Sequence, residues 1–291
     1  MNGIIITNQQ IGHNKYKINR LCEEFKKAHV KIDVFNNDGT LGLIKDDVAV
    51  INLPKANFVI YLDKDIYLAK LLEKAGYRLF NRADFIKLCD DKTYTNIACA
   101  NNGIRMPKTI AGPLVYREIN EDNLTFLDNV IDELGLPLIF KQVYSSLGLG
   151  VHLVNTKEEL VSLYKEHYKE PIQFQEYIQT SFGTSIRVLI INQKVVDGFM
   201  RYNPSDFRSN FGVSASSKKL LENEKYFKFA QKIADIFKIE YAGIDLLIGN
   251  SNEPILCEIN SNAFFEEFEK VTGKNVAKLF VDMVVEKIAH E

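Results

Sequence analysis

Apolar residues follow two different spacings in the first third of the chain. Short apolar runs predict buried strands at residues 4–7, 30–35, 57–62 and 77–80. Apolar positions spaced three or four apart predict helices at residues 15–28 and 64–75. Because strands that alternate with helices favour a parallel sheet, this pattern predicts a small α/β domain over residues 1–85.

The rest of the chain carries more closely spaced strands. Strands are predicted at residues 137–141, 151–154, 172–178, 185–191 and 195–201. Helices are predicted at residues 84–89, 92–101, 124–134, 156–165, 222–237 and 275–289. The turn-forming stretch Asn192-Gln193-Lys194 between two strands indicates a β-hairpin. The last helix has an apolar stripe, which is typical of a core or interface helix.

A second hairpin is predicted near the end of the chain, where apolar runs flank the turn-forming stretch GNSNEP. With the turn centred between residues 251 and 252, Asp245 lies opposite Glu258 across the two strands. Asn260 follows on the same face as Glu258, because side chains in a strand alternate between faces. The sequence therefore predicts two carboxylates and a carboxamide close together.

Two interpretations of this hairpin stay open at this stage. Opposed like charges destabilise a strand pair, and a buried carboxylate needs a partner, so a cation would explain the arrangement. An all-oxygen set of this kind suits Mg²⁺, which commonly bridges to nucleotide phosphates. The alternative is an exposed hairpin end whose carboxylates are solvated.

A loop of small residues joins the strands predicted before and after residues 142–150, whose sequence is QVYSSLGLG. Such a loop lets backbone N–H groups approach phosphate oxygens, although many hairpins also carry glycines. It lacks the GK[ST] ending of a Walker A loop, and no helix follows it as in a Rossmann fingerprint. Lys92 is predicted at a helix start, where a cation opposes the helix dipole unless a phosphate lies nearby; a solvated lysine is the alternative.

Two arginines, Arg187 and Arg201, occur inside mostly apolar strands. A buried arginine needs an anionic partner. Carboxylates of the protein and a phosphate group of a ligand are both suitable, since the guanidinium fork matches either group.

Composition narrows the function classes. The chain has 291 residues, of which 46% are hydrophobic, and a formal net charge of −2, which gives no electrostatic case for nucleic-acid or membrane binding. The four cysteines show no metal-ligand spacing, which favours free thiols and a reducing compartment. With no signal-like or membrane-spanning segment, we expect a soluble, cytoplasmic protein.

In this order, the motifs resemble those of the ATP-grasp superfamily, and within it the RimK-like amino-acid ligases. The resemblance covers about residues 84–290. It rests on Asp91-Lys92, LIFK followed by SSLGLGV, FQEYI, SIRV, DFRSN, GIDLL, and CEINSN followed by FEKVTG. The set D…E-x-N together with DFRSN is its most specific part.

The resemblance implies an ATP-grasp fold, in which two α+β lobes clamp ATP behind an N-terminal α/β domain. It places a central lobe at residues 86–180 and a C-terminal lobe with the metal site at residues 181–291. It also implies ATP and one or two Mg²⁺ ions as cofactors, with Mn²⁺ as a substitute, and together with the apolar last helix it suggests a homo-oligomer.

The resemblance also assigns roles to individual residues. Groups facing the triphosphate and the reacting carboxylate are expected to be Arg187, Arg208 and Asn210. Metal ligands are expected to be Asp245, Glu258 and Asn260. Nucleotide contacts are expected from Lys92, Lys141, Ser145, Ser146, Gly148, Gly150, Gln175, Glu176, Tyr177, Ile178 and Arg201.

Three departures from the family pattern bear on the substrate. Ser185 replaces the usual acidic residue, so a contact to ribose is weakened or supplied elsewhere. Residues 211–214 (FGVS) replace a basic, glycine-rich piece. After Asn260 the usual Ser-x-Pro-Gly becomes Ser-Asn-Ala-Phe-Phe, where Phe264 and Phe265 either line a substrate pocket or pack against the final helix.

The function implied is an ATP- and Mg²⁺-dependent carboxylate–amine ligase acting on an amino acid or peptide. The carboxylate is activated as an acyl phosphate, which an amine then converts to an amide. No Ser-His-Asp or Cys-His constellation competes with this interpretation. Alternatives are a nucleotide-binding module of the same fold without ligase activity, and a nicotinamide-dependent oxidoreductase, which the missing GxGxxG disfavours.

Overall fold

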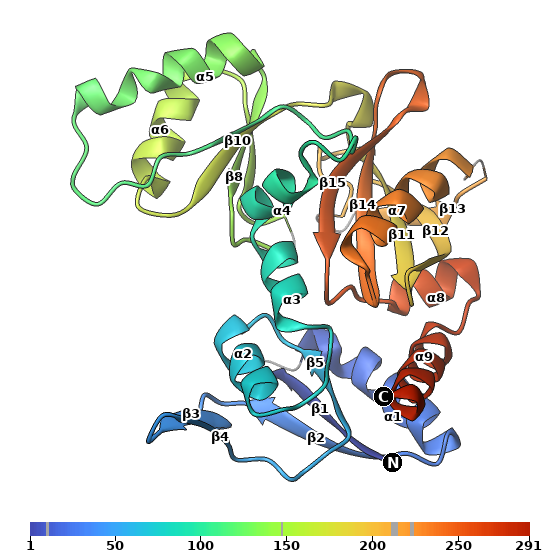
Figure 1. The fold of residues 1–291 in the computed structure, drawn as a ribbon. Helices are drawn as coiled ribbons and strands as arrows, with labels where there is room; N and C mark the ends of the chain where they lie inside the picture. The colour runs from blue at the N-terminus through green and yellow to red at the C-terminus, as the bar shows by residue number, and fades with distance from the viewer. Residues whose placement is uncertain (10–11, 147, 211–214, 222–223) are drawn as a thin grey trace.

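A computed structural model describes residues 1–9, 12–146, 148–210, 215–221 and 224–291 (Figure 1). The N-terminal part contains a four-stranded parallel sheet in the order β2-β1-β5-β6. Its strands are β1 (Asn2–Asn8), β2 (Lys31–Asn37), β5 (Phe58–Leu62) and β6 (Leu79–Phe80). The parallel sheet predicted from the alternating pattern is therefore present.

Helices α1 (Lys15–Lys27) and α2 (Ile66–Lys74) cover this sheet. The side chain of Asp65 caps α2 by accepting hydrogen bonds from the backbone N–H groups of Tyr67 and Leu68, as short polar residues do at helix starts. A hairpin of β3 (Gly42–Lys45) and β4 (Val48–Ile51) projects beside the sheet (Figure 1) and was not predicted.

Helices α3 (Ala83–Asp90) and α4 (Lys92–Cys99) lead from the parallel sheet to a second, antiparallel sheet in the order β7-β10-β8-β9 (Figure 1). Its strands are β7 (Thr109–Ala111), β8 (Leu138–Gln142), β9 (Val151–Val154) and β10 (Ile172–Glu176). Helices α5 (Phe126–Leu134) and α6 (Lys157–His167) bury their apolar faces against it in one cluster around Phe140 and Phe174.

A third, five-stranded sheet has the order β13-β12-β11-β14-β15, with every neighbouring pair antiparallel. Its strands are β11 (Thr184–Ile191), β12 (Lys194–Tyr202), β13 (Ser216–Lys219), β14 (Tyr241–Ile248) and β15 (Pro254–Asn260). Helix α7 (Glu224–Phe237) packs on one face of this sheet, in a cluster with Ile186, Ile244 and Leu256.

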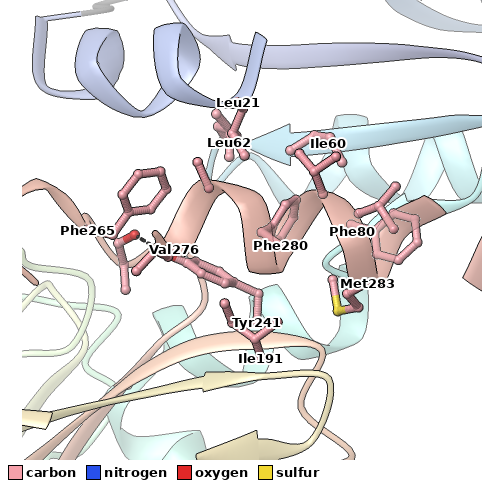
Figure 2. Close-up of a cluster of buried hydrophobic side chains, with 14 of the residues drawn as sticks. Leu21, Ile60, Leu62, Phe80, Ile191, Tyr241, Phe265, Val276, Phe280 and Met283 are labelled. Carbon is pink, nitrogen blue, oxygen red and sulfur yellow. Dashed lines mark hydrogen bonds between the residues drawn. The ribbon is translucent and has the colours of Figure 1, made fainter. Parts of the chain in front are cut away.

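The last two helices, α8 (Glu266–Thr272) and α9 (Val276–His290), return the chain to the N-terminal sheet. Val276, Phe280 and Met283 of α9 lie between Leu62 of the parallel sheet and Tyr241 of the third sheet (Figure 2). The apolar stripe of the last helix is thus buried in a core that joins the first and third sheets.

Most predicted elements are present within a few residues of their expected bounds. The hairpin β3–β4, strand β13 and helix α8 were missed. Strand β13 and helix α8 carry no clear apolar period, whereas β4 has the apolar sequence VAVI, which could have indicated the hairpin. The predicted helix start at residues 222–223 lies outside the described residues. Within the described ranges, no helix combines the length and apolarity that crossing a bilayer requires.

Candidate functional site

Strands β14 and β15 pair so that Asp245 lies opposite Glu258, as predicted. The outer half of the hairpin differs from the prediction, because Leu246 pairs with Leu256 and the turn is centred on Ser251. Cys257 is therefore an extra residue on β15, and this bulge restores the pairing of Asp245 with Glu258. Bulges commonly redirect side chains beside functional sites.

The bulge directs two consecutive side chains, Cys257 and Glu258, toward the same cavity. Beside them, the Asn260 amide group donates hydrogen bonds to Asp245 Oδ2 over 3.2 Å and to Glu258 Oε1 over 3.0 Å. The three predicted metal ligands therefore converge. Two carboxylates and a carboxamide form an oxygen donor set of the kind that suits Mg²⁺, and the Asn260 amide would have to rotate to present its oxygen. Among the described residues, no group of three or more His, Cys, Asp or Glu side chains could hold a metal.

Asp245 is also held by an arginine. The Arg187 guanidinium donates two hydrogen bonds to the Asp245 carboxylate, one of them 2.5 Å long, and both side chains are buried. Burial alone would raise the pKa of Asp245, but the charge and hydrogen bonds of Arg187, together with the charge of Arg201, outweigh this effect and lower that pKa. Arg201 Nη1 lies 3.6 Å from the same carboxylate. Both arginines therefore lie beside a carboxylate of the protein, which is one of the two kinds of anionic partner expected for them.

A cavity between the second and third sheets collects most of the predicted nucleotide-binding and catalytic residues. It is lined by Lys92, Lys141, Ser145, Ser146, Gly148, Gln175, Glu176, Tyr177, Ile178, Arg201, Arg208 and Asn210, together with Asp245 and Glu258. These residues come from six separated stretches of the chain, so only the fold brings them together. We call this space the first cavity.

The loop between β8 and β9 closes over the first cavity through two cations. Lys92 Nζ donates to the backbone carbonyls of Val143, over 3.0 Å, and Ser145. Arg208 Nη1 donates to the Gly148 carbonyl over 2.7 Å. Burial lowers the pKa of Lys92, while the nearby Glu258 opposes this effect. Leu147 of the same loop lies outside the described residues.

A second cavity of about 480 Å³ adjoins the first. Glu258 lines both cavities, whereas Asn260 and Arg187 line only the second. Asn8 at the end of β1, and Asp63 and Lys64 directly after β5, form its other wall. The carboxyl ends of neighbouring parallel strands are a common place for ligands. The predicted metal ligands thus lie where the two cavities meet.

Two of the residues expected to face the nucleotide or the reacting carboxylate do not line the first cavity. Arg187 faces Asp245 and the second cavity. Gly150 lines neither, but a Cβ atom there would come within 2.6 Å of the Ser145 Cβ atom, so the loop needs a glycine at this position. Ser185, the departure from the family pattern, lines the first cavity, and its hydroxyl lies 2.6 Å from that of Ser209. The departure at residues 211–214 lies outside the described residues.

The segment after Asn260 depends on residues that sequence reasoning missed. Lys17 of α1 is 2% exposed, and its Nζ donates to Asn262 Oδ1 over 2.8 Å and to the Ala263 carbonyl over 3.1 Å. The Asn81 amide donates to the Ser261 carbonyl over 2.7 Å. A signal for Lys17 exists, because it precedes the core residue Leu21 by four positions and so shares the apolar face of α1.

The two aromatic residues of this segment have different surroundings. Phe265 is 1% exposed, and its ring meets that of Tyr16 edge-on with the centroids 6.1 Å apart. It packs in the core beside α9 (Figure 2). Phe264 is 41% exposed and lines the second cavity. Phe265 therefore packs against the final helix, which was one alternative, and Phe264 lines a cavity, which was the other.

A family model described as a RimK-like ATP-grasp domain matches residues 89–284. The chain belongs to the RimK-like ATP-grasp family. The match spans the second and third sheets and the first cavity, whereas one wall of the second cavity precedes it. The family resemblance and the ATP-grasp fold expected from the motifs are confirmed.

Relatives of this RimK-like chain include proteins named for ligation. It is 30% identical to the uncharacterized protein MG012 of Mycoplasma genitalium over 87% of this chain and 89% of that one. It is 33% identical to a probable alpha-L-glutamate ligase of Aliivibrio fischeri over 73% and 68% of the two chains. It is 28% identical to beta-citrylglutamate synthase B of Danio rerio over 85% of this chain, which covers 62% of that synthase.

Solved structures share the whole fold at low sequence identity. The D-alanine–D-alanine ligase of Bacillus anthracis superposes with a TM-score of 0.76 and 18% identity, over 100% of this chain and 98% of that one. The ATP-grasp ligase PsnB, in complex with a minimal precursor, Mg and ADP, gives 0.69 and 13%, over 98% and 97% of the chains. These likenesses confirm the fold of the RimK-like chain.

Proposed function

We propose that the chain is an ATP- and Mg²⁺-dependent ligase that joins a carboxylate to an amine of an amino acid or peptide. The observation that carries this proposal is the meeting of two cavities at Glu258. The first cavity contains the residues expected to bind nucleotide, and the second is large enough for organic substrates. Relatives named as glutamate ligases and synthases support the same reaction class.

The proposed reaction has two steps. A carboxylate oxygen attacks the γ-phosphorus of ATP, and the bond to the ADP oxygen breaks, which gives an acyl phosphate. The amine nitrogen then attacks the acyl carbon, the bond to phosphate breaks, and the nitrogen loses a proton. Because little covalent chemistry is required of protein groups, catalysis rests on alignment and on positive charge where negative charge develops.

The side chains at the junction match these requirements. Asp245, Glu258 and Asn260 would hold Mg²⁺, which when bound supplies a Lewis acid and a template for the phosphates. Arg187 orients the Asp245 carboxylate through two hydrogen bonds. Lys92 and Arg208 lie where they would exchange their contacts to loop carbonyls for phosphate oxygens, and the loop that they hold would exclude water.

Hydroxylamine trapping tests this proposal without knowledge of the natural amine. Purified protein is incubated with ATP, Mg²⁺, hydroxylamine and each member of a panel of amino acids, dipeptides and di- and tricarboxylic acids. We expect ADP release and hydroxamate formation with a subset of the carboxylates, and amide products by mass spectrometry when amino acids replace hydroxylamine. Binding of an ATP analogue without hydroxamate from any carboxylate would instead identify a nucleotide-binding module.

A further inference from the structure

Glu267 in the first turn of α8 contacts Arg201, a cationic side chain that lines the second cavity. Its Oε2 atom accepts hydrogen bonds from Arg201 Nη2 over 2.9 Å and from Arg201 Nε over 3.1 Å, and its Oε1 accepts one from Ser217. Both Glu267 and Arg201 line the second cavity. We propose that Glu267 is a specificity-determining residue that neutralises Arg201, so that the cavity selects amino acids or peptides with an uncharged side chain over dicarboxylic ones.

The charges around the second cavity support this inference, which rests on the proposed ligase function. Within the part of the chain that the structure describes, its lining carries four cationic and four acidic side chains: Lys64, Lys92, Arg187 and Arg201, and Asp63, Asp90, Glu258 and Glu267. Among those cations, Lys64 pairs with Asp90 at 2.5 Å. The residues at 211–214 are uncharged in the sequence.

The remaining cations are positioned for the reaction centre. Arg187 is held by Asp245, and Lys92 binds carbonyls of the loop over the first cavity. A second carboxylate on a substrate would therefore have to compete with Glu267 for Arg201, or lie in the cavity without a cation. An anion that loses water without gaining a partner is strongly disfavoured.

Apolar groups complete the same wall of the second cavity. Ala263 and Phe264, which precede Glu267 in the chain, line the second cavity. This wall suits an uncharged side chain, because apolar surface is removed from water on both partners. The segment that carries these groups departs from the family pattern, and it begins directly after Asn260, the last of the predicted metal ligands.

Substrate pairs that differ in one charge test the inference. Initial rates of amide formation are measured for L-glutamine against L-glutamate and for L-asparagine against L-aspartate, with ATP and Mg²⁺. We expect wild-type protein to favour the uncharged member by about tenfold or more in kcat/KM. Glu267→Gln keeps the shape of the side chain, exposes Arg201 to the substrate, and should shift this ratio about tenfold toward the acid.

The neighbouring Glu266→Gln is the matched control, because Glu266 pairs with Lys270 on the surface and does not line the cavity. Calorimetric titration of L-glutamate in the presence of Mg²⁺ and a non-hydrolysable ATP analogue gives a readout independent of turnover. Glu267→Gln should bind L-glutamate more tightly than wild type does, whereas Glu266→Gln should not.

Several outcomes would overturn the inference while leaving the ligase proposal intact. The first is a wild-type preference for the acids. The second is a Glu267→Gln variant in which both the ratio of kcat/KM values and L-glutamate binding are unchanged. The third is a Glu267→Gln variant with a lower KM for ATP and an unchanged ratio, which would place Arg201 on the nucleotide. Failure of hydroxamate formation with every carboxylate of the panel would overturn the ligase proposal itself, and this inference with it.

Discussion

Two adjacent stretches of the chain line the second cavity and are held in different ways. The end of β14 and β15 that carries the predicted metal ligands is fixed by cross-strand neighbours close in sequence, such as Asp245 and Glu258. The segment at residues 261–267 is fixed from far away, by Lys17 of α1 and by Asn81 after β6. Its position therefore depends on how the N-terminal sheet docks against the third sheet.

Under the proposed function, this difference would separate chemistry from selectivity. The hairpin end carries the predicted metal ligands, and a local strand pair sets the positions of Asp245 and Glu258. The following segment carries Ala263, Phe264 and Glu267, which shape the second cavity. If the proposals hold, substitutions in the neighbouring segment would change substrate selectivity without moving the predicted metal ligands, because the two stretches are anchored to different parts of the molecule.

The largest effect is expected from the substitution of a predicted metal ligand at the end of β14 and β15. Glu258→Gln should lower the rate of ADP release by about a thousandfold, equivalent to ~4 kcal/mol in the activation barrier, because it removes an anionic ligand at the junction of the cavities. The exposed Glu253→Gln at the hairpin turn is the control. Near-wild-type turnover of Glu258→Gln, with circular dichroism showing an intact fold, would contradict the metal assignment.

Asp245 is a less clean target than Glu258. Removal of its charge by Asp245→Asn would leave the buried Arg187 without its carboxylate partner, which typically costs about 3–5 kcal/mol of stability. Loss of turnover in that variant would therefore combine lost metal binding with partial unfolding. Urea unfolding of both variants separates the two causes, since Glu258→Gln is expected to keep a near-wild-type midpoint.

A smaller effect should distinguish the two phenylalanines of the following segment. Phe265→Ala should lower the free energy of unfolding by about 3 kcal/mol, because it opens a cavity in the core that joins the first and third sheets. Phe264→Ala should change stability by less than about 1 kcal/mol, yet raise KM for substrates that contact the second cavity. Equal destabilisation by both substitutions would show that Phe264 packs in the core as well.

The smallest effect concerns the anchor of the segment, Lys17. Burial lowers the pKa of Lys17 to about 7, while its two hydrogen bonds to oxygens and the Tyr241 ring 4.3 Å away favour the charged form. Because the folded-state pKa is below the unfolded one, the native protein binds fewer protons above pH 7 than the unfolded chain does. The free energy of unfolding therefore rises with pH in this range, as the unfavourable effect of this residue becomes smaller.

Comparison with Lys17→Met measures this linkage. Between pH 7.0 and pH 8.5, the free energy of unfolding of wild type should rise by about 1.5 kcal/mol relative to that of Lys17→Met. Lys270→Met, at an exposed position of α8, should show no such pH dependence. Parallel stability curves for wild type and Lys17→Met over this range would mean that Lys17 stays charged in the folded protein.

Sequence patterns predicted the elements that bury regular apolar faces. The parallel sheet, helix α9 and the β14–β15 hairpin all follow from residue spacing. Elements with irregular spacing, such as β13 and α8, were missed, because their stability comes from docking onto other elements rather than from their own period. The turn of the hairpin was also placed slightly wrongly, since a bulge at Cys257 has no signature in the apolar pattern.

The sequence by itself determined the family, the strand pair with Asp245 and Glu258, and the order of the motifs. These depend on local spacing, which the chain carries wherever it folds. Tertiary structure alone decided that Arg187 binds Asp245, that Glu267 pairs with Arg201, and that Phe265 is buried whereas Phe264 is exposed. The physical reason is that partners of buried charges and contacts of loop residues come from segments distant in sequence, whose approach is set by packing of the sheets.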